Sequence, residues 1–285
     1  KNVKAVACGG KLPIELADEE SFKDVAKQQY DLLGESMLKV GFEAFGTNMV
    51  SDMVNARGGY PTRNWQQGVF EDIEEVNSEA LTEKVLVKGV NCFACPIACG
   101  RGTKIKEGKW AGHSGEGPEY ETIYALGSDC EVDDLAALTK ANYECNELGI
   151  DTISMGSTIA CAMELFEKGY LPESDVGMAL KWGDAEALVK LVRQTGLRQG
   201  FGDSLAEGSL RLATRYGHPE LAMVAKGQDF AGYEPRGEQG MGLAYATSPI
   251  GASHMRGDPA YFELLGVPTT IDPLTWEDKP PIVAK

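Results

Sequence analysis

The sequence predicts a mainly α, multi-helical fold with two helical lobes, irregular glycine-rich loops and few short strands. Three observations support this prediction. Apolar residues recur every three to four positions over long stretches, which is the period of an α-helix. Several of these stretches begin at an aspartate and end at a glycine, the residue types favoured at the two ends of a helix. Strand-like patterns occur at two places, residues 2–8 and residues 221–226.

Two helices are expected near the N-terminus. Residues 20–39 place apolar side chains on one face of a single amphipathic helix, and residues 45–56 form a second helix. The apolar face of the first helix consists of Phe22, Val25, Ala26, Tyr30, Leu33 and Met37.

Four further helices are predicted from their ends. Each begins at an aspartate that can accept a hydrogen bond from a free backbone N–H, and each stops before a glycine. Their spans are 134–148 with Asp133 as the cap, 151–168, 184–195 and 203–216, and the glycines expected to end them are Gly149, Gly169, Gly196 and Gly217.

The chain divides into two predicted lobes, residues 17–150 and residues 151–285. Residues 1–16 are expected to form a terminal strand without a partner, and a single strand is not stable alone. The last residues, 280–285, show no closing helix. These features predict a piece of a longer polypeptide whose second lobe is incomplete at its C-terminus.

Residues 227–258 form a long segment that is dense in glycine. Loops of this length usually bring their backbone close to a ligand or are disordered. The interspersed alanine, tyrosine and threonine residues favour an ordered segment that contacts a ligand.

Composition narrows the class of protein. The 285 residues carry 43 acidic and 27 basic side chains, a net charge of −16. Such a surface repels nucleic acid and anionic lipid, so neither is expected as a partner. No stretch resembles a signal peptide or a membrane span, and the cysteines do not follow a disulfide pattern, which together predict a cytoplasmic protein.

Three of the seven cysteines are clustered. Cys92, Cys95 and Cys99 form a C-x-x-C-x-x-x-C motif that can direct three thiolates at one metal centre. Soft thiolate ligands select zinc or an iron–sulfur cluster, and the spacing alone leaves both open.

Several segments together resemble the family of tungsten-containing aldehyde:ferredoxin oxidoreductases. They follow the order of that family along essentially the whole chain. They are the opening KNVKAVA, YPTRNWQQG at 60–68, CFACPIACG at 92–100, GPEYET at 117–122, NELGIDTIS at 146–154 and the segment 240–254.

The resemblance implies an enzyme that oxidises an aldehyde to a carboxylic acid at tungsten, with molybdenum as the alternative metal, held by two pterin cofactors. Electrons leave through a [4Fe–4S] cluster to ferredoxin. Cys92, Cys95 and Cys99 match three of the four cluster ligands, and the fourth belongs to a downstream motif that this chain does not contain. Residues 1–16 resemble the end of the domain that holds most of the pterin, so the chain alone is expected to be inactive.

The resemblance also assigns residues to the reaction. Glu121 and His254 match an acid and a histidine near the metal, where either could act in general acid–base catalysis. Taken alone, Glu121 would more often be a solvated acid in the first turn of a helix, and His254 could equally be an ordinary loop residue. Asn146, Gly149, Ile150 and Asp151 match a pterin-binding motif, with Asn146 where the family has aspartate.

Two other functions stay open. The chain could be a non-catalytic electron-transfer or zinc-stabilised helical module, which would leave Glu121, His254 and the pterin motif without a role. It could also belong to a reductase of the same superfamily that acts on an aromatic acyl thioester. The oligomeric state is not predicted, and a homo-oligomer is compatible with the sequence.

Overall fold

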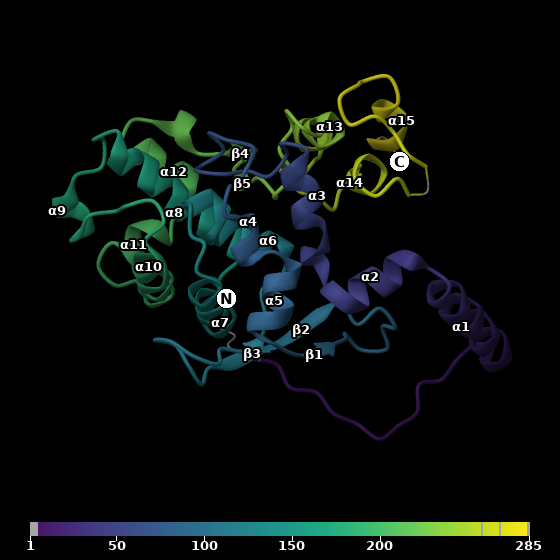
Figure 1. Cartoon of the computed structure of the whole chain (residues 1–285). Helices are drawn as coiled ribbons and strands as arrows, with labels where there is room; N and C mark the ends of the chain where they lie inside the picture. Colours follow the sequence, from purple (N-terminus) through teal and green to yellow (C-terminus); the bar gives the residue numbers. More distant parts are fainter. Residues whose placement is uncertain (1–4, 258, 268, 284–285) are drawn as a thin grey trace.

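The computed structural model describes residues 5–257, 259–267 and 269–283. These residues form many helices and two small sheets, so the prediction of a mainly α fold is confirmed (Figure 1). Within the described residues, no helix is both long enough and apolar enough to cross a membrane. The proposed boundaries between lobes remain predictions.

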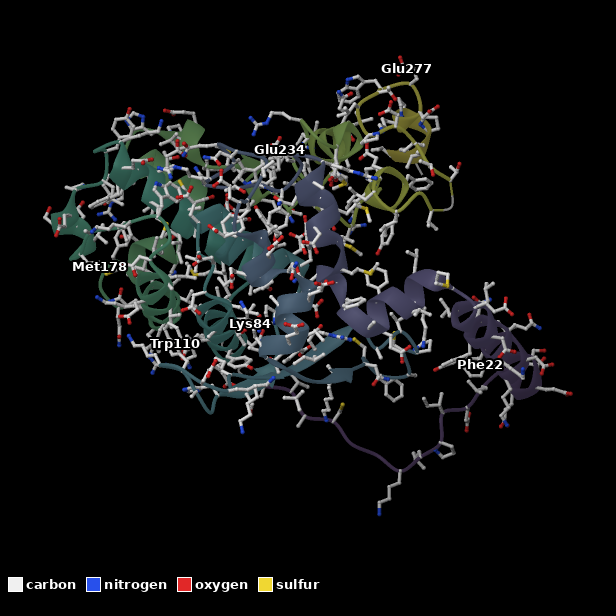
Figure 2. All side chains as sticks on the ribbon, viewed as in Figure 1. Phe22, Lys84, Trp110, Met178, Glu234 and Glu277 are labelled. Atoms are coloured by element: carbon white, nitrogen blue, oxygen red, sulfur yellow. The ribbon has the colours of Figure 1, made fainter. Side chains whose placement is uncertain are left out.

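The N-terminal helix is shorter than predicted. Residues 20–39 do not form one helix: α1 (Glu19–Gly34) ends at a glycine, and α2 (Met37–Phe45) begins after Ser36, whose backbone is extended. The break sends α1 away from the rest of the molecule, and Phe22 lies on this outlying helix (Figure 2). The expected strand at 2–8 starts outside the described residues, and residues 5–8 are exposed and form no regular structure.

A short 3-10 turn, η1 (Thr47–Val50), and α3 (Ser51–Ala56) replace the single helix predicted at 45–56. The helices α4 (Ile73–Val76) and α5 (Ser78–Lys84) then lead into an antiparallel sheet. Its strands lie in the order β1 (Leu86–Val90), β2 (Gly100–Lys104) and β3 (Ser114–Glu116). This sheet was not predicted from the sequence. The cysteine motif is the loop that joins β1 to β2, where Val90 pairs with Gly100.

The core is built around α8 (Thr152–Glu167), which packs against α6 (Tyr120–Leu126) and lies beside the turn η2 (Ser128–Cys130). Gly156 permits this contact, because a Cβ atom there would lie 2.2 Å from the carbonyl carbon and oxygen of Ala125. The two helices are also joined near their N-termini, where the hydroxyls of Thr122 and Thr152 lie 2.9 Å apart.

The predicted helix ends are partly correct. Asp151 caps α8, and Gly149 ends α7 (Leu135–Leu148) in the left-handed conformation, as predicted. The cap of α7 is Asp134 and not Asp133, because the Asp134 carboxylate accepts the hydrogen bond from the Ala137 N–H.

One predicted stop, at Gly196, is wrong, and the helix predicted at 203–216 is broken, although Gly217 with φ of +82° follows its end as predicted. Helix α10 (Ala185–Leu197), capped by Asp184 as expected, runs through Gly196 and ends at Arg198, which adopts the left-handed conformation. The predicted helix 203–216 is two helices, α11 (Gly202–Leu205) and α12 (Ser209–Arg215), separated at Gly208 with φ of +87°. A short α9 (Glu173–Val176) precedes them.

The C-terminal part supplies loops and short helices above the core. The strand predicted at 221–226 is reduced to β4 (Val224–Ala225), paired with β5 (Gln228–Asp229) after the turn η3 (Pro219–Leu221). The glycine-dense segment is ordered and contains α13 (Gln239–Thr247), although Asp258 lies outside the described residues. Helices α14 (Ala260–Glu263) and α15 (Lys279–Val283) follow, tied by a fully buried ion pair of 2.6 Å between Lys279 and Glu263.

Candidate functional site

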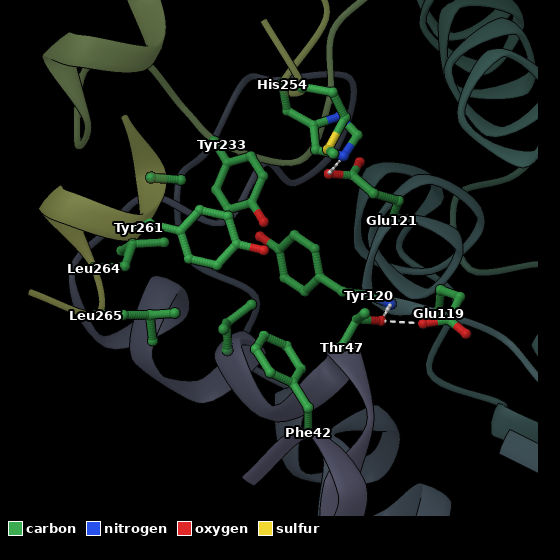
Figure 3. Close-up of a pocket in the computed structure, with 13 residues that line it drawn as sticks. Phe42, Thr47, Glu119, Tyr120, Glu121, Tyr233, His254, Tyr261, Leu264 and Leu265 are labelled. Atoms are coloured by element: carbon green, nitrogen blue, oxygen red, sulfur yellow. Dashed lines mark hydrogen bonds and ion pairs between the residues drawn. The ribbon is translucent and has the colours of Figure 1, made fainter. Parts of the chain in front are cut away.

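A largely apolar pocket of about 330 Å³ lies where α2, η1, the start of α6, two loops and α14 meet (Figure 3). Glu121 and His254 lie at one end of it, and Glu119 with Thr47 at the other, with aromatic rings between. Its lining consists of Phe42, Thr47, Val50, Glu119, Tyr120, Glu121, Tyr233, His254, Met255, Ala260, Tyr261, Leu264 and Leu265.

The structure brings Glu121 and His254 together from distant parts of the chain. His254 Nε2 lies 3.9 Å from Glu121 Oε1, and Glu121 Oε2 accepts a hydrogen bond of 2.9 Å from the Gly232 N–H. Glu121 is therefore a mostly buried, oriented carboxylate and not a solvated first-turn acid. Burial lowers the pKa of His254, although the carboxylate of Asp151 opposes this effect, so the imidazole is neutral near pH 7.

The start of α6 is held in place by a threonine. Thr47 Oγ1 accepts from the Tyr120 N–H at 2.9 Å and donates to the Glu119 carboxylate. Glu119 has an extended backbone and directly precedes Tyr120, the first helical residue of α6. Glu119 and Glu121, on either side of Tyr120 in sequence, thus reach the two ends of one pocket.

Aromatic rings build the pocket wall. Tyr120 contacts Tyr60 and Tyr233 with ring centroids 5.8 and 5.2 Å apart, and its hydroxyl donates to the Gly232 carbonyl. Sequence reasoning missed Glu119, Tyr120 and Tyr233 as site residues. The motif Glu119-Tyr120-Glu121 was the signal that could have indicated the first two.

The predicted pterin motif borders a second hollow. Gly149, Ile150 and Asp151 line a cavity of about 370 Å³, whereas Asn146 is exposed and does not line it. Asp151 Oδ2 accepts from the Ser154 N–H at 2.8 Å. The motif and the Glu121–His254 pair lie on neighbouring parts of the molecule, because the hydroxyls of Thr122 and Thr152, which follow Glu121 and Asp151 in sequence, lie 2.9 Å apart.

The cysteine loop lies close to the same region. Cys92 is exposed, Cys95 and Cys99 are half-buried, and all three are free thiols. Cys92 and Cys99 line a hollow of about 590 Å³ that Glu119 also lines. Glu119 is thus the residue that borders both the thiol hollow and the apolar pocket. Burial, with a smaller effect of the Glu119 carboxylate, raises the pKa of Cys99.

The donor set of this loop fits a thiolate-bound metal centre. Cys92 and Cys99 line one hollow, and the Cys95 N–H donates to the Cys92 carbonyl at 3.0 Å, so the three residues belong to one tight loop. As they stand, no three His, Cys, Asp or Glu side chains in the described part of the chain are close enough to hold a metal ion. The other cysteines are poor ligands or distant: Cys8 is exposed, whereas burial raises the pKa of Cys145 to about 12 and raises those of Cys130 and Cys161.

Comparisons with known proteins identify the family of this chain. The family profile described as "Aldehyde ferredoxin oxidoreductase, domains 2 & 3" matches residues 24–285. Tungsten-containing aldehyde ferredoxin oxidoreductases of Thermococcus kodakarensis and Pyrococcus furiosus are 42% and 41% identical over 276 residues. Each of these matches covers 96% of this chain and 45% of the relative.

A solved structure shares the fold. It is the active-site complex BamBC of benzoyl coenzyme A reductase in complex with 1,5-dienoyl-CoA. The match has a TM-score of 0.58 and 21% identity, and covers 72% of this chain and 32% of that one. At this identity the likeness concerns the fold alone.

The matched segments define the chain as part of an oxidoreductase. It belongs to the aldehyde ferredoxin oxidoreductase family. The chain spans about half the length of the curated relatives it matches.

Proposed function

We propose that this chain forms the substrate-binding and cluster-binding parts of an enzyme that oxidises an aldehyde to a carboxylic acid and passes the electrons to ferredoxin in the cytoplasm. The observation that carries the proposal is the convergence of Glu121 and His254 in one apolar pocket. The overall change is aldehyde plus water to carboxylic acid, with release of two protons and two electrons.

Two groups that the chain would bind supply the redox chemistry. When bound, a tungsten or molybdenum bis-pterin accepts the electron pair, and a [4Fe–4S] cluster passes the electrons on singly. Cys92, Cys95 and Cys99 would provide three cluster ligands. Gly149, Ile150 and Asp151 would contact the pterin, with Asn146 at the edge of that contact.

The residues of the pocket handle the substrate and its protons. Glu121, fixed by the Gly232 N–H, removes a proton from the water that attacks the aldehyde carbon. The neutral His254 donates a hydrogen bond to the aldehyde oxygen, which gains negative charge during the attack. The aromatic rings exclude bulk water and position the substrate.

The lining of the pocket favours a neutral, apolar aldehyde. Of the thirteen residues that line it, none is a lysine or arginine, and two are glutamates. An aldehyde that carries a phosphate or carboxylate would meet like charge without a compensating cation. We therefore expect benzaldehyde to have a much higher kcat/KM than glyceraldehyde 3-phosphate.

The test uses this chain joined to the flanking domains of the Thermococcus kodakarensis relative, assayed anaerobically with a viologen dye. Glu121→Gln should lower kcat about 100-fold or more, because the amide accepts no proton at neutral pH. Glu220→Gln, at an exposed site, is the control and should leave kcat unchanged. Full activity of Glu121→Gln would contradict the assigned role.

A structural zinc site is the competing function, because three thiols suit either zinc or an iron–sulfur cluster. Metal and acid-labile sulfide analysis of the anaerobically purified chain separates the two. Iron with sulfide supports the proposal, whereas zinc without sulfide supports a zinc-stabilised module.

A further inference from the structure

Arg101 is a buried cation that lies next to the cysteine loop. Its side chain stands on β2, two residues after Cys99, and the residue is 2% exposed. The guanidinium donates five hydrogen bonds, and every acceptor is a backbone carbonyl. The distances are 3.1 Å from Nε to Cys99, 3.0 Å from Nε to Gly100, 2.9 Å from Nη1 to Ala44, 2.9 Å from Nη2 to Glu43 and 2.8 Å from Nη2 to Ala98.

These carbonyls belong to two segments. Ala98, Cys99 and Gly100 form the end of the cysteine loop, whereas Glu43 and Ala44 lie in the last turn of α2. The last carbonyls of a helix lack partners within the helix and carry the negative end of its dipole. Arg101 thus fastens the cysteine loop to the end of α2, the helix whose Phe42 lines the apolar pocket.

The junction is tightly packed. Gly46, which ends α2 with φ of +69°, would place a Cβ atom 3.0 Å from the Cys99 carbonyl oxygen and 3.2 Å from Arg101 Cδ and Nε. Ala98 has φ of +56°, a conformation that disfavours any residue with a side chain. A loop held in this conformation needs contacts that fix it, and Arg101 provides them.

The charge of Arg101 has no ion-pair partner among the described residues, although the carboxylates of Glu119 and Glu43 act on it from a greater distance. Most other arginines of the chain do form ion pairs. A buried charge without a counter-ion is costly, and backbone dipoles compensate it in part. An anionic group at Cys92, Cys95 and Cys99 would complete the compensation.

We propose that Arg101 positions the thiolate loop and compensates the negative charge of the cluster that the loop would hold, which raises the reduction potential of that cluster. The proposal rests on the proposed cluster site. A cluster with thiolate ligands becomes more negative on reduction, so a fixed cation beside it favours the reduced form.

The test compares three variants of the chain. Arg101→Met removes the charge and all five hydrogen bonds, and Arg101→Lys keeps the charge but not the planar fork that reaches both segments. Lys88→Met is the control, because Lys88 lines the same thiol hollow but is exposed to solvent, where its charge is screened.

The first readout needs no cluster. In the metal-free chain, hydrogen exchange of the amides at 98–102 should be at least about tenfold faster in Arg101→Met and Arg101→Lys than in wild type or Lys88→Met. Unchanged exchange in both Arg101 variants would overturn the positioning role. Should Arg101→Met not fold, Arg101→Lys decides this point.

The second readout is the midpoint potential of the reconstituted cluster, followed by electron paramagnetic resonance. We expect a lower potential in Arg101→Met, a value near wild type in Arg101→Lys and no change in Lys88→Met. Equal potentials in Arg101→Met and Lys88→Met would overturn the charge role. Wild-type chain that takes up zinc and no iron would instead overturn the proposed cluster, and the exchange readout would still decide the positioning role.

Discussion

Helices α1 and α8 have the same length and the same type of cap, yet they occupy opposite environments. Each has 16 residues, and each begins after an aspartate that accepts a hydrogen bond from the backbone N–H of a serine three residues on. Eleven residues of α8 are buried. In α1, which lies entirely within the described residues, no residue is buried.

The difference lies in the faces of the two helices. In α8 small and apolar residues such as Gly156 and Ala160 surround the axis, so neighbours can pack on several sides. In α1 nine of the sixteen residues are charged or polar, and the apolar stripe that includes Phe22 (57% exposed) contacts little of the molecule. A long-range hydrogen bond of 2.5 Å runs from the Tyr30 hydroxyl of α1 to the Ala94 carbonyl of the cysteine loop. Local sequence signals such as the caps therefore determine that a helix forms, whereas the side chains on its faces determine whether it is buried or exposed.

The largest expected contrast comes from shortening an apolar side chain in each helix. Ile159→Ala in α8 should lower the free energy of unfolding by about 2–5 kcal/mol, because Ile159 is fully buried and its loss leaves a cavity. Phe22→Ala in α1 should change it by less than about 0.5 kcal/mol. Urea denaturation followed by circular dichroism measures both. A large loss for Phe22→Ala would show that α1 packs against the body in solution.

A smaller contrast comes from adding one methyl group. Gly156→Ala should destabilise the chain by about 1–3 kcal/mol, because the new Cβ overlaps the Ala125 carbonyl and forces α6 and α8 apart. Gly34→Ala, at the end of α1, meets no atom within 4 Å and should be neutral or slightly stabilising. The same denaturation experiment applies, and a neutral Gly156→Ala would mean that the two helices pack less closely than described.

This contrast also explains how much the sequence could predict. Caps at Asp151 and Asp184 and the stop at Gly149 were predicted because each is a local hydrogen-bond or φ preference. The sheet β1–β3 was missed because glycines such as Gly100 and Gly102 obscure its alternation. The breaks at Ser36 and Gly208 lie inside stretches that were predicted as single helices from their apolar period and their ends, and neither signal marks a break within the stretch.

The site residues also differ in whether the sequence could predict them. Glu121, His254 and the cysteines were found through motifs that resemble a family, and their roles remain predictions. Tyr233 and Arg101 were not found, because their significance lies in contacts with residues far away in sequence. Arg101, for example, binds carbonyls of α2 that are 57 and 58 residues distant.

The last contrast concerns pH, because the contributions of a buried and an exposed aspartate to stability change with pH in opposite directions. Asp129 of η2, next to α8, is fully buried, and its pKa is raised to about 8, chiefly by burial and also by the charges of Asp229 and Glu164. Between about pH 4 and pH 8 the folded chain therefore holds a proton that the unfolded chain has released. The contribution of Asp129 to stability is complete below pH 4 and is lost as the pH rises toward 8.

Asp129→Asn removes this proton uptake and keeps an oxygen for the Trp65 N–H, which Asp129 Oδ1 binds at 3.2 Å. Relative to wild type, the variant should gain about 4 kcal/mol between pH 5 and pH 8.5, because each pH unit over which only the folded chain holds the proton changes the free energy of unfolding by about 1.4 kcal/mol. Asp18, the exposed cap of α1, has a lowered pKa, because its carboxylate accepts hydrogen bonds from Ser21. Its contribution is lost only as the pH falls below 4, so the difference between Asp18→Asn and wild type should stay constant from pH 5 to pH 8.5. A difference for Asp129→Asn that is equally constant would show that this carboxyl is ionised in the folded chain, and that the surroundings of η2 are more polar than its burial indicates.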